Sequence, residues 1–282
     1  PDLRVVARCG SGSGVACRHV AVSAPATSGR LVLVPNALDL GAEPEPIDAI
    51  LSQPVLRRAA GLTHWVVENA KTARSFLKRV DAVQPLGTPL QALNIQELPR
   101  PRKGSGDSVP DAAWQALLAP ALAGQEVGLL SDAGLPAVAD PGAGLVAAAY
   151  ALGVRVEVLT GASSLTLALA ASGLNGQRFA FEGYLPQAPA DRQARVRELE
   201  QRSRREGQTQ LVIETPYRNE VLLQALCQQL QPSTRLAVAC GLTSAGGWCE
   251  SKTVESWRRQ IQMAGRLPMP DKLPAVFMWL AA

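Results

Sequence analysis

The stretch "SDAGLPAVADPG", residues 131–142, decides how the chain is built. It follows the apolar run "VGLL" (127–130), which has the length and composition of a buried strand. After it comes a run of small apolar residues (144–152) that is typical of a helix. Glycine tolerates backbone conformations that other residues avoid, and proline fixes φ, so their concentration here predicts a loop of special shape. A buried strand that ends in such a loop indicates a ligand site, with Asp132 at its start.

Strands and helices alternate on both sides of this loop. Short apolar, often β-branched runs predict strands over residues 31–34, 64–68, 127–130, 154–158, 178–182, 210–214, 236–240 and 275–280. Helices are expected over residues 72–79, 111–123, 144–152, 164–172, 191–206, 219–230 and 254–262. This order favours an α/β protein with largely parallel sheets and flanking helices.

The length and composition are those of a folded globular protein. The chain has 282 residues, of which 47% are hydrophobic and only 18% charged, enough for one large or two ordinary domains. We expect a loosely ordered extension over 1–28, an N-terminal α/β lobe over 29–140 and a C-terminal α/β lobe over 141–282. The Pro/Gly cluster at 136–144 is the expected hinge.

Several classes of chemistry are disfavoured by the residue inventory. The five cysteines form no C-x-x-C pair, and His19 and His64 are the only histidines, so we expect neither a disulfide framework nor a metal site. The start of the sequence does not read as a signal peptide, and no apolar segment reaches the roughly 18 residues of a membrane helix. The expectation is a cytoplasmic protein that does not engage a membrane.

The net charge is +4 and the pI is about 9.0, which favours an anionic partner such as RNA. Six arginines lie within residues 191–206. This segment is either a solvated helix with ion pairs to Glu198 and Glu200 or a nucleic-acid contact. A second basic loop, 99–110, contains Lys103, which could meet phosphate.

The glycine-rich "GSGSG" at 10–14 is not a dinucleotide-binding motif. That motif needs a strand before it, a helix after it and an acidic residue about 20 positions further on. Neither a helical stripe nor an acidic residue follows here.

Four unusual turns follow predicted strands, at residues 34–41, 131–142, 160–164 and 214–218. The carboxyl ends of parallel strands share one edge of a sheet, and ligands bind at that edge in open α/β proteins. The turn at 160–164 also begins a helix, where backbone N–H groups and the hydroxyls of Ser163 and Ser164 are available as donors. The four turns together predict one ligand site.

Seven segments carry a family resemblance, in matching order and spacing. They are "VPNALDLG" (34–41), "VENAKTARSFLK" (67–78), "LLSDAGLPAVADPG" (129–142), "TGASSLTLALAASGL" (160–174), "RFAFEGYLP" (178–186), "ETPYR" (214–218) and "ACGLT" (239–243). The chain resembles the tetrapyrrole (corrin/porphyrin) methylase superfamily, and within it the branch that methylates cytidine 2′-oxygens of small-subunit ribosomal RNA.

This resemblance implies a two-lobed, homodimeric protein that binds S-adenosylmethionine in the cleft between its lobes. By position in the motifs, the residues implied to border the cofactor are Pro35, Leu38, Asp132, Leu135, Ser163, Ser164, Ile213 and Pro274. Methyl transfer needs the acceptor held in line with the methyl–sulfur bond, and an alcohol acceptor also needs a base. Glu68 and Glu214, each closing a predicted strand, are the candidate catalytic carboxylates, and both are equally compatible with a structural role.

The chain departs from this branch on the acceptor side. Its "EDTR" is Glu68–Lys71 here, a histidine is replaced by Tyr217, and "ARELT" is replaced by residues 239–243. Three functions stay open: RNA ribose methylation, methylation of a small molecule or another nucleic-acid position, and RNA or partner binding by a catalytically silent relative.

Overall fold

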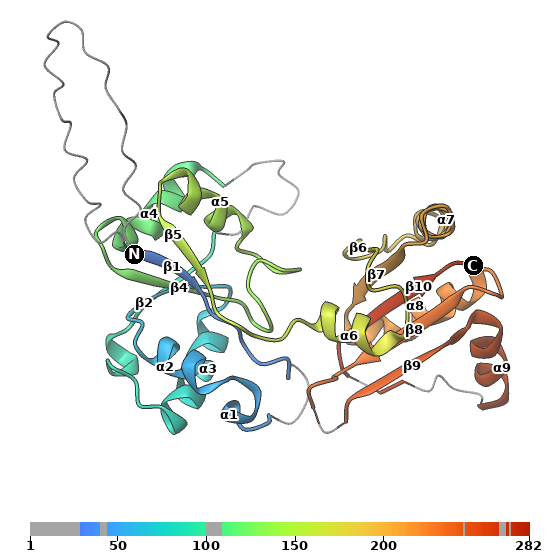
Figure 1. The fold of residues 1–282 in the computed structure, drawn as a ribbon, viewed down its shortest axis with the longest axis horizontal. Coiled ribbons are helices and arrows are strands. Elements are labelled where there is room, and N and C mark those ends of the chain that lie inside the picture. Colours follow the sequence, from blue (N-terminus) through green and yellow to red (C-terminus); the bar gives the residue numbers. More distant parts are fainter. Residues whose placement is uncertain (1–28, 40–43, 100–108, 245, 265–268, 271) are drawn as a thin grey trace, which may run out of the picture.

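The computed structural model describes residues 29–39, 44–99, 109–244, 246–264, 269–270 and 272–282. The extension expected over 1–28 and the basic loop around Lys103 lie outside these residues. The described chain forms two α/β lobes that stand side by side in Figure 1, each built on one five-stranded sheet.

The first sheet has the strand order β3-β2-β4-β1-β5, and all its strand pairs are parallel. Its strands are β1 (Arg30–Leu33), β2 (His64–Val67), β3 (Asn94–Glu97), β4 (Glu126–Leu130) and β5 (Arg155–Val158). Its helices are α1 (Ile47–Ile50), α2 (Gln53–Ala60), α3 (Ala70–Val83), η1 (Leu90–Ala92), α4 (Asp111–Leu122) and α5 (Ala143–Ala151). Two separate apolar clusters show why the apolar strands are needed: one lies under α1–α3 and the other under α4 and α5, so both faces of the sheet are buried.

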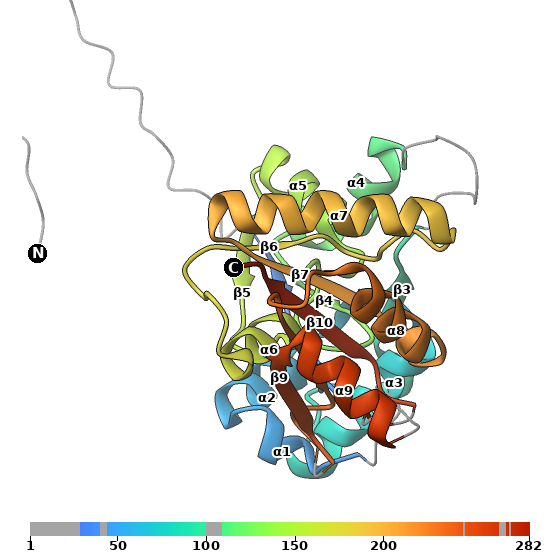
Figure 2. The same cartoon turned by 90° about the vertical axis from the view of Figure 1, so that its right-hand side faces the viewer.

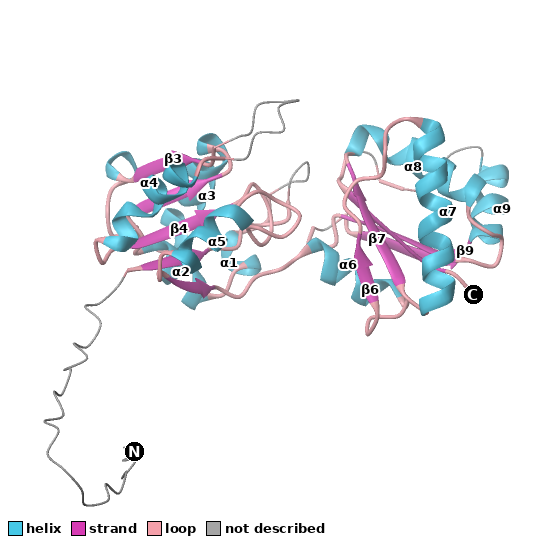
Figure 3. Cartoon of the chain, turned by 90° about the horizontal axis from the view of Figure 1, so that it is seen from above, coloured by secondary structure: helices cyan, strands magenta, loops and turns pink. Residues whose placement is uncertain are grey.

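The second sheet has the order β6-β7-β10-β8-β9. Its strands are β6 (Phe179–Phe181), β7 (Thr209–Glu214), β8 (Arg235–Cys240), β9 (Trp248–Thr253) and β10 (Ala275–Leu280). Its helices are α6 (Ser164–Ser172), α7 (Pro189–Glu206), η2 (Pro216–Arg218), α8 (Asn219–Gln229) and α9 (Val254–Ala264). Helix α6 packs on the face turned toward the first lobe (Figure 3), whereas α7, α8 and α9 cover the outer face (Figure 2).

The expectation of largely parallel sheets is correct for the first sheet and wrong for the second. Only β6 and β7 pair in parallel, while β10 runs antiparallel to both β7 and β8, and β9 runs antiparallel to β8. Strands β8 and β9 are joined by a short turn, which can connect only antiparallel neighbours. Strand β10, the last strand in the sequence, lies in the middle of the sheet between β7 and β8.

The strand pairing also places the boundary between the two lobes at a different residue from the one expected. Strand β5 pairs with β1, and α5 packs against α4, so both belong to the first lobe. The chain therefore passes to the second sheet after Val158, later than the boundary expected at 140–141. The crossing segment is the turn 160–164, one of the four unusual turns.

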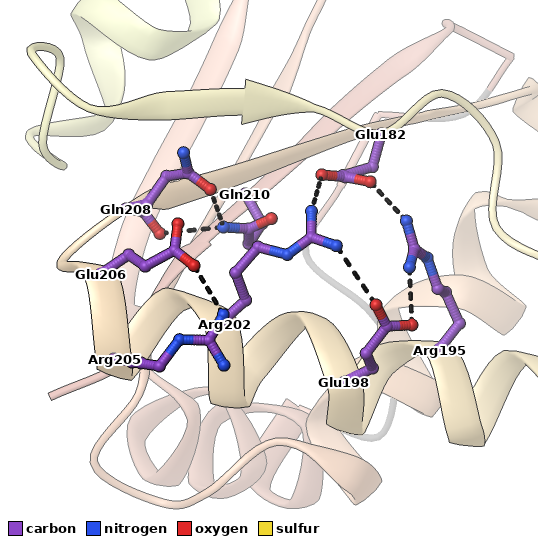
Figure 4. Close-up of polar contacts among 8 residues, drawn as sticks. All are labelled: Glu182, Arg195, Glu198, Arg202, Arg205, Glu206, Gln208 and Gln210. Carbon is purple, nitrogen blue, oxygen red and sulfur yellow. Dashed lines mark hydrogen bonds and ion pairs between the residues drawn. The ribbon is translucent and has the colours of Figure 1, made fainter.

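Three of the six arginines of α7, namely Arg195, Arg202 and Arg205, form ion pairs within their own lobe. Arg195 and Arg202 each contact both Glu182 and Glu198, at 2.5–3.2 Å (Figure 4). The expected pairing with Glu198 is therefore present. Glu200 instead is buried and accepts hydrogen bonds from the Gln231 N–H and the Thr234 hydroxyl.

Candidate functional site between the lobes

A cavity of about 340 Å³ lies where the two lobes meet. The first lobe contributes Leu38 and the loop 133–140, and the start of α6 contributes Ser163 and Ser164. The second lobe contributes the ends of β7 and β8 and the residues that lead into β10. The lining is mainly apolar with a few polar groups, as is usual for the site of a small organic ligand.

All four unusual turns reach this one cavity. Leu38 comes from the first, Leu135 from the second, Ser163 from the third and Glu214 from the fourth. Three of these turns follow strands of the first sheet, and the fourth follows β7 of the second. Turns that are far apart in the sequence are thus brought together by the topology of the two sheets.

Asn36 holds the first two turns against each other. Its buried side chain donates to the backbone oxygens of Ser131 (3.1 Å) and Asp132 (3.0 Å), and its Oδ1 accepts from the Ala37 N–H at 2.8 Å. The backbone N–H of Asn36 donates to the oxygen of Gly134 at 2.9 Å. Gly134 has φ +63°, a conformation that favours glycine. One asparagine therefore fixes the shape of the cavity wall.

The third turn passes so close to the first that it requires a glycine. A Cβ placed on Gly161 would lie 2.1 Å from the Cβ of Pro35. Pro35 itself is not among the cavity-lining residues. Pro35 instead packs against Gly161, and its implied place beside the cofactor stays a prediction.

The loop 131–142 stores backbone strain next to the cavity. Ala137 and Ala139 have φ of 66° and 63°, and Ala139 lines the cavity. A left-handed conformation costs a residue with a Cβ about 1–2 kcal/mol. Strain of this kind is concentrated at functional sites in proteins.

The start of α6 presents hydrogen-bond donors to the cavity. Ser163 occupies the N-cap position, and the described residues show no capping bond from its side chain. The first N–H groups of any helix lack partners within the helix. Together with the hydroxyls of Ser163 and Ser164, they can hold a carboxylate or another anionic group.

The second lobe closes the cavity from the other side. Ile213, Glu214 and Pro274 line it. The Thr243 hydroxyl donates to the Leu38 oxygen at 3.2 Å, a hydrogen bond that joins the lobes at the cavity. Thr243 belongs to the "ACGLT" motif, so a signal for it was present in the sequence although no role was assigned to it.

Three acidic side chains gather beside the loop 131–142. The Asp132 N–H donates to Glu68 Oε2 at 3.1 Å, and Asp132 Oδ1 is buried without a hydrogen-bond partner in the described part of the chain. Neither Glu68 nor Asp132 is among the lining residues, whereas Asp140 is. Burial, followed by the charges of Glu68 and Asp132, raises the pKa of Asp140 from 3.8 to about 7. Sequence reasoning missed Asp140, although it is the second aspartate of the loop that decided the fold.

Glu214 is held in place by its neighbours. Its Oε1 accepts from the Thr215 N–H (2.7 Å) and from Arg218 Nε (2.9 Å), and it forms an ion pair with Arg218. Tyr184, which also lines the cavity, has its pKa raised by burial and by the charges of Glu214 and Asp140. The polar groups of the cavity thus belong to one electrostatically connected set.

The described ranges contain neither a grouped set of metal ligands nor a membrane-spanning helix. No three or more His, Cys, Asp and Glu side chains there are grouped to hold a metal ion. No helix among those residues is long and apolar enough to cross a membrane.

The fold and the site define a two-lobed α/β protein whose ligand cavity lies between the lobes. A solved structure with this architecture is the methyltransferase CobJ, which matches with a TM-score of 0.53 at 16% identity, over 90% of this chain and 95% of that one. Residues 68–261 match the tetrapyrrole (corrin/porphyrin) methylases. The chain belongs to this family, which confirms the resemblance found in the sequence.

Curated relatives are similar over shorter stretches. The ribosomal RNA small subunit methyltransferase I of Pseudomonas aeruginosa is 43% identical over 95 residues, 34% of this chain and 32% of the relative. The protein of the same name from Synechocystis sp. is 40% identical over 129 residues, 46% of this chain and 45% of the relative. The matched stretches thus span between a third and a half of these relatives.

Proposed function

We propose that the chain transfers a methyl group from S-adenosylmethionine to a ribose 2′-oxygen of ribosomal RNA. The family is one of methylases, and the curated relatives at 40–43% identity carry the name of a ribosomal RNA methyltransferase. The observation that carries the proposal is the convergence of four turns, from both lobes, on one cavity of about 340 Å³.

The cavity has the chemistry that S-adenosylmethionine requires. Leu38, Leu135 and Ile213 offer apolar surface to a flat adenine, and the start of α6 offers donors to a carboxylate. In this proposal Asp132, whose Oδ1 is buried without a partner among the described residues, accepts a hydrogen bond from the cofactor once the loop adjusts. When bound, the cofactor supplies the electrophilic methyl group.

The protein must also orient the acceptor hydroxyl and accept its proton. Asp140 and Glu214 both line the cavity. Asp140 is the better suited to accept the proton, because its pKa of about 7 suits proton transfer near neutral pH and Glu214 is paired with Arg218. Glu68 contributes through its charge, which raises that pKa, and Glu214 is oriented by Arg218. The sequence makes Glu68 and Glu214 candidate catalytic carboxylates; in this proposal they act instead as positioning groups, Glu68 for Asp140 and Glu214 for the acceptor side.

Homodimerisation is part of the same proposal. Two apolar side chains of the first lobe are strongly exposed: Tyr150 on α5 is 68% exposed and Val158 on β5 is 61% exposed. Strand β6, at the edge of the second sheet, also exposes Phe179. Exposed edges and apolar patches of this kind are common at subunit interfaces. Sedimentation equilibrium tests this point, and a monomer at micromolar concentration would contradict it.

We also propose a cytoplasmic location, because the proposed acceptor is ribosomal RNA.

Calorimetry with S-adenosylmethionine tests the cofactor. Ser164 lines the cavity, whereas Ala170 is exposed on the same helix and does not. Ser164→Trp should fill the cavity and lower cofactor affinity by tenfold or more, and Ala170→Trp should leave it unchanged. Equal effects of the two variants would count against this cavity.

Transfer of labelled methyl groups tests the acceptor. Label should enter the RNA of small ribosomal subunits from cells that lack this gene. Label that enters only small molecules would replace the RNA proposal with the small-molecule one. Absence of both binding and transfer would favour a silent relative.

A further inference from the structure

A second hollow adjoins the cavity on the outside of the second lobe. It measures about 480 Å³ and shares Pro216 with the cavity. We call it the Tyr217 groove; its walls include Tyr217, Val221, Met269 and Lys272. Whatever occupies the groove therefore sits next to whatever occupies the cavity.

Tyr217 is an exposed ring with a fixed support. It is 80% exposed, which is unusual for a large aromatic side chain in a folded protein. The guanidinium of Arg218 lies over the ring at 5.5 Å from its centroid. Arg218 is itself held by Glu214, at 2.9 Å from Nε to Oε1. A chain of contacts from the cavity wall thus orients the ring.

The rest of the groove suits a flat, uncharged ligand with polar edges. Val221 is half exposed and adds apolar surface, while the charges of Lys272 and Glu220 oppose each other. Asn219 is only 2% exposed; its Nδ2 donates to the Leu273 oxygen at 2.8 Å, but its Oδ1 finds no partner in the described part of the chain. A buried acceptor without a donor indicates a missing hydrogen-bond partner, such as an amino group.

We propose that the Tyr217 groove binds an unpaired nucleobase of the RNA, stacked on the Tyr217 ring and adjacent to the nucleotide whose ribose hydroxyl reaches the cavity. Proteins recognise single-stranded RNA by stacking its bases on aromatic side chains and by hydrogen bonds to the base edges. A phosphate would need net positive charge, which the groove does not offer. This inference rests on the proposed RNA substrate and names the part of it that lies outside the cavity.

The test is RNA affinity, measured by fluorescence anisotropy with S-adenosylhomocysteine present. The probes are an unpaired RNA of mixed sequence, about 12 nucleotides long, and an abasic RNA of equal length. Tyr217→Ala should weaken binding of the base-containing RNA about 5- to 100-fold, since a stacked base contributes about 1–3 kcal/mol. Tyr217→Phe and Tyr217→Trp should retain the affinity. The abasic RNA should bind the wild type and Tyr217→Ala equally.

Met263→Ala is the matched control, because Met263 is also strongly exposed but lies on α9 and does not line the groove. It should leave RNA affinity unchanged. Equal affinity of the wild type and Tyr217→Ala for base-containing RNA would overturn the stacking role while leaving the methyltransferase proposal intact. Failure of the wild type to bind either RNA, with cofactor binding preserved, would overturn the RNA substrate itself and the groove with it.

Discussion

Replacing Asp140 by asparagine should stabilise the protein and abolish its activity. The carboxyl has an ordinary pKa of 3.8 and a pKa of about 7 in the folded chain. In a fully buried site this difference would correspond to roughly 4 kcal/mol. Because Asp140 is only partly buried, solvent screening reduces the effect to about 1–2 kcal/mol. An asparagine side chain is uncharged at every pH, so the Asp140→Asn variant avoids this cost.

The pH dependence of the free energy of unfolding follows from the direction of this pKa change. A carboxyl whose pKa is raised by folding opposes folding once it ionises, so the wild type loses this stability as pH rises from about 4 to 7. The excess free energy of unfolding of Asp140→Asn should therefore be near zero at about pH 4 and reach its full value above about pH 7. Urea titrations across this range measure it.

Activity should move in the opposite direction. Methyl transfer by the wild type should increase with pH through about 7, as Asp140 becomes able to accept a proton. Asp140→Asn should lower the transfer rate by roughly 10²-fold or more with little change in cofactor affinity. An asparagine variant that is less stable than the wild type at pH 8, or that retains its turnover, would refute this reasoning.

Three further predictions concern the same wall of the cavity. Glu68→Gln should shift the pH–activity profile to lower pH, because it removes a charge that raises the pKa of Asp140; an unshifted profile would contradict this. Asp132→Ala should weaken cofactor affinity by tenfold or more in calorimetry, about 1.4 kcal/mol, and an unchanged affinity would remove Asp132 from the site. Gly161→Ala should lower the free energy of unfolding by about 1–3 kcal/mol, because the new Cβ meets Pro35. Gly176→Ala is the control and should be neutral, because a Cβ there meets open space. Similar values for both variants would contradict a tight contact between residue 161 and Pro35.

The sequence predicts the central strands and main helices well but misses two of the four edge strands. Every strand and helix expected from apolar runs is present in the structure. Strands β3 and β9 were missed because "NIQE" and "WCESKT" have no regular apolar pattern, whereas the other two edge strands, β5 and β6, have one. The direction of the second-sheet strands depends on β10, whose place between β7 and β8 no local pattern reports.

The candidate site, like the fold, was predicted where the signal is local in the sequence and missed where it depends on the assembled structure. The sequence predicted which segments meet, because turns that follow strands can be recognised locally from their glycine and proline residues. It did not separate Leu135, which lines the cavity, from Pro35, which packs against Gly161 and is not among the lining residues. The importance of Asp140 depends on its burial and on the charges of Glu68 and Asp132, which are properties of the assembled loops.

The central place of β10 has a consequence for biosynthesis. The first sheet has all its strands once residue 158 has left the ribosome, so that lobe can fold early. In the second lobe, β7 and β8 are not paired with each other, and they are joined only when β10, which begins at Ala275, arrives between them. The residues that lead into β10 also line the cavity. A nascent chain should therefore be unable to bind a ligand in this cavity until β10 has emerged.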